Sequence, residues 1–394
     1  MSDFATPESA HIAIVGAGFC GSLAAVVLAR AGHRVTLIDR HSVYPKQFRV
    51  EKFAGGQLDL MRKLGIFNAI AEASTPFKNF ANVRAGRVID RAYNQHYGIL
   101  YEEIVRVVRA QLPSSVEFIV DDVVDLKIGR QKQDVTLSRG VPLSVDLILL
   151  ATGMNGALAH RLGFGQRMVS EGHSISFGFT IAAEPELTFN ALTCYGTGAS
   201  NRIDYLSLFP IGDTLRANLF TYLDHRDPWI RELRRSPAAR LRDSMPGLAA
   251  HFGPRDTVDS LQNWMMNLTT AENVNQDGIV LIGDAFQTSC PATGMGVTRL
   301  LTDVDRLCNV HIPQWLATPE MGKEKIATYY RDPIKQAVDA EAMRMAHFRR
   351  SLTIDRSLRW KFRRQEHFVR RRVFDLVERV RSKRSGSPKP PSSP

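Results

Sequence analysis

The sequence predicts an α/β protein in which a Rossmann-type dinucleotide-binding domain carries an inserted β-sheet domain and is followed by a C-terminal helical region. Three observations predict this organisation. Glycine-rich strand–turn–helix patterns begin at Ile12 and again at Ile279. Residues 171–275, between them, form short alternating segments rich in β-branched and aromatic residues. Beyond residue 320 the apolar residues take helical spacing and the chain becomes basic.

The first glycine-rich unit predicts a nucleotide site. The apolar run 12–15 predicts a buried strand, and it leads into glycines at positions 16, 18 and 21. In this G-x-G-x-x-G pattern, Gly16 permits a sharp turn, Gly18 lets the backbone approach a pyrophosphate, and Gly21 lets the helix pack on the strand. Asp39 ends the next strand, where its carboxylate can accept a hydrogen bond from a ribose hydroxyl. The unit alone does not distinguish FAD from NAD(P).

The next segments continue an α/β domain. A Gly-Gly turn at 55–56 precedes a predicted helix, and Arg49 and Lys52 lie just before it, where they either reach a phosphate or substrate or remain solvated surface charges. A helix is expected over Tyr101–Leu112, followed by strands over 116–120, 123–128 and 135–137. A buried strand then ends at Gly153. This order of elements is the build of a glutathione-reductase-like FAD-binding domain.

The second glycine-rich unit supplies a further ligand-binding turn. A buried strand from Ile279 ends at Gly283-Asp284, and Asp284 is well placed to accept a hydrogen bond from a ribityl or ribose hydroxyl. A loop containing Pro291, Gly294 and Gly296 then opens a helix that runs through Asp303. Its glycines let backbone amides approach a ligand at a helix N-terminus.

We therefore expect a discontinuous chain organisation. The FAD-binding domain takes residues 10–75, 96–170 and 276–320, and the sheet-rich substrate domain takes 76–95 and 171–275, with a helical interruption at 228–252. Residues 321–383 form the basic helical region. Residues 1–9 and 384–394 are expected to be disordered by composition.

Three motifs in the right order resemble the class A flavoprotein monooxygenases with the para-hydroxybenzoate hydroxylase-like fold. They are the first glycine unit with Asp39, the strand ending Ala151-Thr152-Gly153, and the unit from Gly283 through the following Pro-x-x-Gly-x-Gly to Asp303. The resemblance spans roughly residues 10–310 and implies that the cofactor is FAD. The residues expected to contact FAD are Gly16, Gly18, Phe19, Cys20, Gly21, Asp39, Arg40, Gly283, Asp284, Pro291, Gly294, Met295 and Gly296.

The resemblance implies an FAD-dependent monooxygenase that hydroxylates an aromatic or polyketide-like small molecule through a flavin C4a-hydroperoxide. The chain departs from the family pattern at Thr152, where hydroxylases usually have Asp, and at Tyr101, Gln287 and Thr298. Because the usual Asp is linked to NADPH use, the electron donor is either NAD(P)H or a separate flavin reductase. No tryptophan lies in the W-x-W-x-I-P motif of the related halogenases.

Two alternative functions stay open. One is an FAD-dependent dehydrogenase or reductase of a hydrophobic, prenyl-lipid-like substrate, and the other is a flavoprotein that acts on a protein partner as a maturation or assembly factor. No acid–base pair identifies the catalytic side chains. Tyr205, Arg202 and Trp264 are candidates that are also explained as packing or surface residues, and Cys290 is expected to be a small filler near the flavin ring.

The charge distribution and the cysteines limit the possible binding partners and the cellular compartment of the protein. The formal net charge is +11, but residues 321–394 hold 20 Lys and Arg against 8 Asp and Glu, so the first 320 residues are near neutral. Four scattered cysteines without a C-x-x-C pair favour a reducing cytoplasm and no metal site. The glycine-interrupted N-terminal apolar run lacks a basic flank and predicts neither a signal peptide nor a membrane span.

The C-terminal region carries a basic amphipathic pattern. Within 357–383, apolar residues recur at helical spacing, and arginines crowd the other positions. Such a helix can lie on an anionic membrane surface or bind an acidic protein, so peripheral membrane association is one expectation. The other is that the stripe packs on the body of the protein. No nucleic-acid-binding motif accompanies the charge. The apolar residues are Leu358, Phe362, Val369, Val373, Leu376 and Val380.

Overall fold

A five-stranded parallel sheet forms the centre of the N-terminal part of the protein. The computed structural model describes residues 10–182, 190–245, 248 and 261–384. In sheet order, the strands are β18 (Ile279–Leu281), β12 (Leu147–Leu150), β1 (His11–Val15), β2 (Arg34–Asp39) and β8 (Glu117–Val120). All neighbouring pairs are parallel. Their carboxyl ends therefore meet at one edge, where ligands bind in open α/β sheets.

Helices cover one face of this sheet and a meander covers the other. Ile12 and Ile14 point toward the helical side, whereas Ala13 and Val15 point toward the meander, as strand alternation requires. The helices on the first side include α1 (Phe19–Arg30), α4 (Tyr101–Arg109) and α9 (Met295–Arg306). The antiparallel meander consists of β9 (Val123–Lys127), β10 (Gln133–Leu137) and β11 (Leu143–Val145).

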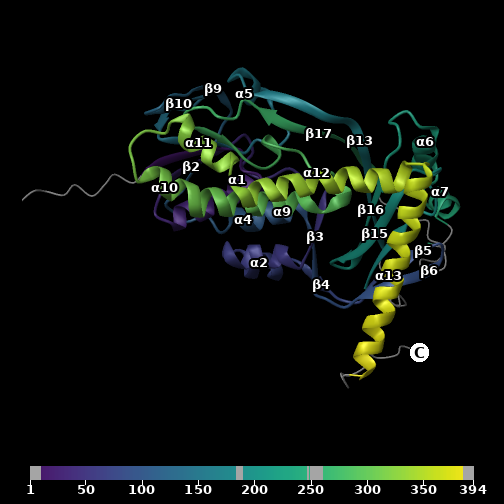
Figure 1. Ribbon diagram of the computed structural model, residues 1–394. Coiled ribbons are helices and arrows are strands. Elements are labelled where there is room, and N and C mark those ends of the chain that lie inside the picture. The colour runs from purple at the N-terminus through teal and green to yellow at the C-terminus, as the bar shows by residue number, and fades with distance from the viewer. Residues whose placement is uncertain (1–9, 183–189, 246–247, 249–260, 385–394) are drawn as a thin grey trace, which may run out of the picture.

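A seven-stranded sheet forms the second half of the molecule (Figure 1). In sheet order, its strands are β17 (Gln262–Glu272), β13 (Gly165–Ala182), β16 (Thr214–Thr221), β15 (Ile203–Ile211), β14 (Ala191–Tyr195), β5 (Phe80–Arg84) and β6 (Arg87–Ala92). Two helices, α6 (Pro228–Arg235) and α7 (Pro237–Ser244), pack on it through Trp229, Leu233 and Leu241. β5 and β6, which come from the expected segment 76–95, thus pair with the strands of the later insertion.

A small antiparallel sheet lies between these two parts. It consists of β3 (Val50–Ala54), β7 (His96–Leu100) and β4 (Thr75–Phe77), and the helices α2 (Gly56–Lys63) and α3 (Phe67–Glu72) connect β3 to β4. The short helix α5 (Ala157–Arg161) follows β12 and precedes β13. The proposed domain boundary at residue 170 falls inside β13, which runs through two register shifts without ending.

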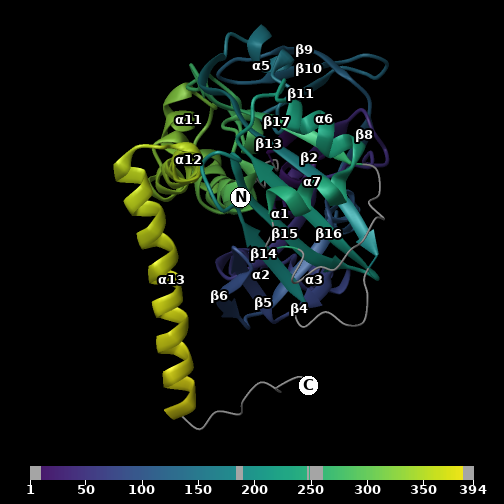
Figure 2. The ribbon, with the colours of Figure 1, turned by 90° about the vertical axis from the view of Figure 1, so that its right-hand side faces the viewer.

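The C-terminal region is helical and runs back across both parts. The two 3₁₀ turns η1 (Gly283–Ala285) and η2 (Pro291–Thr293) precede α9, and the π turn η3 (Leu307–His311) follows it. Next come α10 (Ile312–Leu316), α11 (Lys323–Tyr330), α12 (Pro333–Ile354) and α13 (Leu358–Arg384). Figure 2 shows α13 turning away from α12 along the edge of the molecule. No helix in the described ranges is long and apolar enough to cross a membrane.

The expected disordered ends fall almost entirely outside the described residues. The leader 1–9 and the tail from 385 onward lie outside the described residues. Most of the expected helical stretch beyond residue 245 also lies outside them. Arg384 was expected in the tail, but it ends α13, because the helical spacing of the basic region continues through it.

Candidate functional site

The turn between β1 and α1 leaves the amino end of the helix open. Gly18 is the N-cap residue, and among the described residues no side chain caps the helix and no acid lies in its first turn. Among the described residues outside its own helix and chain neighbours, the nearest atom to a Cβ placed on Gly18 would be Tyr44 Cε2, at 4.0 Å. The amides that follow Gly18 are therefore open to a ligand, and the amino end of a helix favours an anion.

The other two glycines of this unit serve packing. Gly16 has a φ of +102°, and a Cβ there would lie 2.5 Å from the carbonyl oxygen of Ala151 at the end of β12. A Cβ on Gly21 would lie 1.9 Å from the carbonyl oxygen of Gly16. Both positions need glycine because backbone approaches backbone, whereas Gly18 alone faces open space.

Asp39 is fixed at the carboxyl end of β2. Its Oδ2 accepts a hydrogen bond from the amide of Ala17 at 2.7 Å, and its Oδ1 accepts one from the amide of His41 at 2.9 Å. Arg109, at the end of α4, donates to the carbonyl oxygens of Ala17, His41 and Ser42 and lies 3.8 Å from Asp39. Oδ1 also lies 3.3 Å from the ring nitrogen Nδ1 of His41, whereas Oδ2 keeps a second lone pair that a ribose hydroxyl can use.

Charged and aromatic groups gather where β18 ends. Burial raises the pKa of Asp284, and the positive charges of Arg299 and Arg49 offset part of this rise. Burial also raises the pKa of Glu51 on β3 to about 7. The Arg49 guanidinium lies 4.0 Å from the centre of the Tyr101 ring. The family often has an arginine at the position of Tyr101. Here the tyrosine ring instead packs against the guanidinium of Arg49, which lies just before β3.

The loop from Pro291 to Gly296 presents a second open helix N-terminus. Gly294 has a φ of +67° and is the N-cap of α9. The Thr293 hydroxyl accepts a hydrogen bond from the Met295 amide at 3.2 Å, and among the described residues no side chain bonds to the next two amides of the first turn. Apart from their own helix and chain neighbours, the described residues place no heavy atom within 4 Å of a Cβ on Gly294, and Ser289 Cβ lies 3.9 Å from one on Gly296. The hydroxyl of Tyr205 on β15 donates to the carbonyl oxygen of Ala292 at 2.9 Å. This end of α9 therefore lies against the seven-stranded sheet.

The two glycine units are brought together. Cys20 in the first turn of α1 packs on Gly283, where a Cβ would lie 3.2 Å from the Cys20 sulfur. The side-chain amide of Gln57 on α2 donates to the Gly294 carbonyl and to the Thr298 hydroxyl, both at 3.1 Å. The first turn of α1, the turn at Gly283 and the amino end of α9 thus lie next to one another at the candidate site.

A buried ion network supports the second unit from behind. Asp303 on α9 accepts a hydrogen bond from the Gly283 amide at 2.9 Å and one from the Lys335 ammonium at 2.8 Å. Asp339 on α12 pairs with both Lys335 and Arg299. Although burial opposes ionisation of Asp303, Lys335 and Arg299 hold its pKa below the usual value. The network fixes the turn at Gly283 to the C-terminal region.

Most of the expected contact residues border this site, with two qualifications. Phe19 is fully buried in the core beneath the sheet, so only its backbone amide remains for a ligand. Arg40 is exposed and pairs with Asp122 at 3.4 Å. Of the sheet candidates, Tyr205 touches the Pro291 loop, whereas Trp264 on β17 is 46 % exposed and Arg202 is a turn residue with a φ of +52°.

Sequence reasoning missed Arg109 and the roles of Glu51 and Lys335. Arg109 belongs to the predicted helix, but its position in the last turn next to Asp39 follows from the packing of α4 on α1. Lys335 is 1 % exposed, although the basic C-terminal composition predicts a solvated side chain. No signal in the local sequence distinguishes either residue from its exposed neighbours. Cys290 is fully buried, as expected of a small filler.

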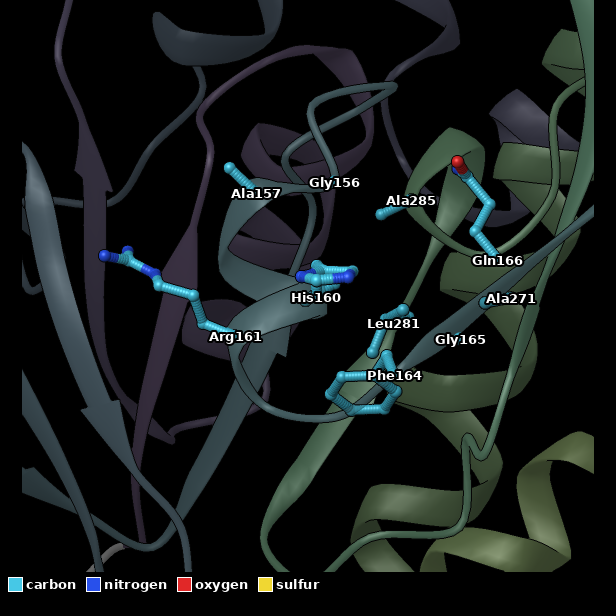
Figure 3. A pocket seen from close by; sticks show the side chains of 11 residues that line it. Gly156, Ala157, His160, Arg161, Phe164, Gly165, Gln166, Ala271, Leu281 and Ala285 are labelled. Atoms are coloured by element: carbon cyan, nitrogen blue, oxygen red, sulfur yellow. The ribbon is translucent and has the colours of Figure 1, made fainter.

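A cavity of about 570 Å³ lies on the other side of β18, next to the meander. Its walls include His160 on α5, Phe164, Leu281 and Ala285, and Figure 3 shows Arg161 pointing away from them. None of the expected FAD contacts lines this cavity. Within the described ranges, no group of three or more His, Cys, Asp or Glu residues is arranged to hold a metal ion.

Comparison with known proteins agrees with this geometry. The family model of the FAD binding domain matches residues 9–310, which is more than half of the chain. The chain is 22 % identical over 317 residues to squalene monooxygenase of Mus musculus, covering 75 % of this chain but only 53 % of that protein. It therefore spans about half the length of this curated relative.

Solved structures share the fold. The p-nitrophenol 4-monooxygenase of Pseudomonas putida superposes with a TM-score of 0.74 at 15 % identity, over 91 % of this chain and 93 % of that one. HpxO of Klebsiella pneumoniae, solved in complex with FAD and uric acid, gives a TM-score of 0.71 at 17 % identity, over 94 % and 95 % of the two chains.

Proposed function

Because this chain belongs to the FAD binding domain family, we propose that it is an FAD-dependent monooxygenase that hydroxylates an aromatic or polyketide-like small molecule. One observation carries this proposal. The open amino end of α9 lies against the seven-stranded sheet through the Tyr205–Ala292 hydrogen bond. A plain nucleotide-binding domain has no need for a second open helix end that faces an inserted sheet.

The residues fit FAD along the carboxyl edge of the five-stranded sheet. The amides after Gly18 would bind the pyrophosphate, and Asp39, oriented by Arg109, would bind the adenosine ribose. Asp284 would accept a hydrogen bond from the ribityl chain. The amides that open α9 at Gly294 would lie at the isoalloxazine ring and stabilise negative charge there.

When bound and reduced, FAD supplies the electrons that activate dioxygen for oxygen transfer. The chain supplies a dry environment beside the Pro291 loop. Phe220, Tyr222, Met266 and Cys290 form a buried apolar cluster there, within reach of Tyr205. Water exclusion at this face would favour oxygen transfer over loss of the oxidising equivalent to hydrogen peroxide.

The electron donor is part of the proposal. Thr152 replaces the aspartate linked to NADPH use, and its hydroxyl donates to the Asn155 carbonyl at 2.9 Å, within its own turn. The lack of a carboxylate at this position favours a separate flavin reductase over direct reduction by NAD(P)H. Anaerobic mixing of the FAD-loaded protein with NADH or NADPH distinguishes the two, since bleaching of the flavin within seconds would establish direct reduction.

A second candidate is an FAD-dependent dehydrogenase or reductase of a hydrophobic substrate. The exposed apolar residues of α13 favour it, because they allow access to a membrane-borne substrate, and the similarity to squalene monooxygenase is consistent with a hydrophobic substrate. A third, action on a protein partner, would use the same helix. Only the monooxygenase inserts an oxygen atom from dioxygen into its substrate.

The test measures whether the electrons of the reduced flavin end in hydrogen peroxide or in a hydroxylated product. Chemically reduced, FAD-loaded protein is mixed with dioxygen in the presence of a panel of phenols and prenyl quinols, and peroxide is quantified. We expect peroxide close to the flavin concentration without substrate and much less with an accepted phenol, together with hydroxylated product. Unchanged peroxide with every compound, and reversible oxidation or reduction of one of them, would instead establish the dehydrogenase.

A further inference from the structure

Among the described side chains, those of α13 that contact the body lie along one side of the helix. Phe368 is 8 % exposed and lies between the ring of Tyr195, at 5.3 Å between centroids, and the guanidinium of Arg84, at 4.1 Å from the ring centre. Arg371 pairs with Asp90 on β6 at 2.7 Å. Figures 1 and 2 both show the helix running along β6 at the edge of the seven-stranded sheet. These contacts fix its orientation on the body.

The side of α13 away from these contacts carries a row of exposed apolar residues, with Gln365 between Phe362 and Val369. At 3.6 residues per turn, they fall within about 60° of one another around the helix axis. The expectation that this row packs on the body is therefore wrong, because Phe368 and Arg371 take the body-facing side. The residues of this apolar stripe are Leu358 (71 % exposed), Phe362 (70 %), Val369 (57 %), Val373 (55 %) and Leu376 (65 %).

Exposed cations border the apolar stripe on both sides. By the same helical geometry, Arg359, Arg363 and Arg370 follow one margin, and Lys361 and Arg372 follow the other. Glu366 lies near the first margin and pairs with Arg370 at 2.6 Å. Residues 357–383 contain ten Lys and Arg against three Asp and Glu. An apolar row between two basic margins is complementary to a surface whose interior is apolar and whose outer boundary carries anionic groups.

We propose that α13 lies flat on the surface of a membrane that contains anionic lipids. The apolar stripe enters the boundary between headgroups and acyl chains, and the flanking cations contact lipid phosphates. The attraction of each basic residue to such a surface adds to that of the inserted apolar side chains. Because the body is attached on the opposite side, the helix can bind lipid without leaving it.

Charge and attachment favour this occupant over others. A second copy that docked stripe to stripe would bring the arginine margins of both helices together, and this repulsion opposes a dimer. The proposal concerns the surface of the membrane, since no helix in the described part of the chain is suited to crossing it. It does not depend on the reaction that the FAD site performs.

The test uses co-sedimentation of the full-length, FAD-loaded protein with vesicles. One set contains phosphatidylcholine alone and the other contains phosphatidylcholine with phosphatidylglycerol. The variants are Phe362→Glu and Val369→Glu, and the matched control is Val141→Glu, at an apolar residue that is 80 % exposed on the meander. Since all three side chains are exposed, the substitutions leave the body intact, which equal flavin content and melting temperature would verify.

We expect wild-type protein and Val141→Glu to sediment only with the anionic vesicles, and added salt to weaken this binding. Each stripe variant should lose at least about tenfold in affinity, since a charge replaces inserted apolar area. Absence of wild-type binding to the anionic vesicles would overturn the proposal, as would stripe variants that bind like wild type. A dimer in light scattering that Phe362→Glu dissociates, without vesicle binding, would assign the stripe to a second copy instead.

Discussion

Lys335 and Asp303 form an ion pair inside the protein, with Nζ 2.8 Å from Oδ1 and both side chains 1 % exposed. The second oxygen of Asp303 accepts the amide hydrogen of Gly283, which precedes the proposed ribityl contact Asp284. Helix α12 therefore reaches the FAD-binding unit through α9. The C-terminal region is a structural support of the cofactor site rather than an independent appendage.

Replacing Lys335 by Met should destabilise the protein and weaken FAD binding, because Asp303 would remain buried without its strongest cation. Removing one partner of a buried pair costs about 3–5 kcal/mol. Lys132→Met is the matched control, since Lys132 pairs with Asp146 at 2.6 Å but the two side chains are 58 % and 29 % exposed. Its expected cost is within about 1 kcal/mol. Denaturant unfolding and FAD titration measure both, and equal effects of the two variants would contradict this role.

Gly18 and Gly21 should respond to substitution in opposite ways. Gly18→Val should fold normally, because the position is extended and open, yet lose FAD affinity by roughly 100-fold, because the side chain fills the pyrophosphate space. Gly21→Ala should lower the stability of the FAD-free protein by about 3 kcal/mol, because its Cβ meets the Gly16 carbonyl. Melting of the FAD-free proteins and flavin fluorescence titration separate the effects. Normal FAD affinity in Gly18→Val would refute the placement of the pyrophosphate.

Arg109 should contribute to FAD affinity through the backbone around Asp39. Its guanidinium fixes three carbonyl oxygens, and hydrogen bonds from a charged group contribute about 1.5–3 kcal/mol. Arg109→Met is therefore expected to weaken FAD binding by roughly 10- to 100-fold. Arg106→Met, one turn earlier and 63 % exposed, should leave it unchanged. Calorimetric titration with FAD would show whether the two arginines differ in this way.

Glu51 should make the stability of the FAD-free protein fall as the pH rises. Burial raises its folded pKa from 4.5 to about 7, so the folded state holds the proton more tightly than the unfolded state does. Stabilisation from this group is complete below pH 4.5 and is lost as the pH passes 7. Compared with Glu51→Gln, wild type should lose stability between these values. Parallel stability curves of the two proteins across this range would exclude the effect.

The glycine units, their strands and the helices after them could be predicted from sequence because each is local. Gly16, Gly18 and Gly21 lie within six residues of one another, and Asp39 ends the adjacent strand. The same holds for the unit from Gly283 to Gly296. Backbone conformation and hydrophobic period fix such units within about 30 residues.

The residues that support the FAD site from behind could not be predicted, because their role depends on contacts between segments that are distant in sequence. Lys335 looks like a surface lysine in a basic region until α12 packs on α9. The apolar stripe of α13 has the period of a packed helix, and only the attachment at Phe368 and Arg371 shows that it faces outward. The same helical spacing of apolar residues arises whether the apolar side of the helix faces the body or faces away from it.

The central claim is that the FAD site inserts oxygen into an organic substrate, and isotope labelling tests it most directly. The reduced, FAD-loaded protein is given isotopically labelled dioxygen and an accepted substrate, and the product is weighed by mass spectrometry. We predict one labelled oxygen atom per product molecule and none when the label is supplied in water. Product without label from dioxygen, formed while the flavin still turns over, would contradict the monooxygenase assignment.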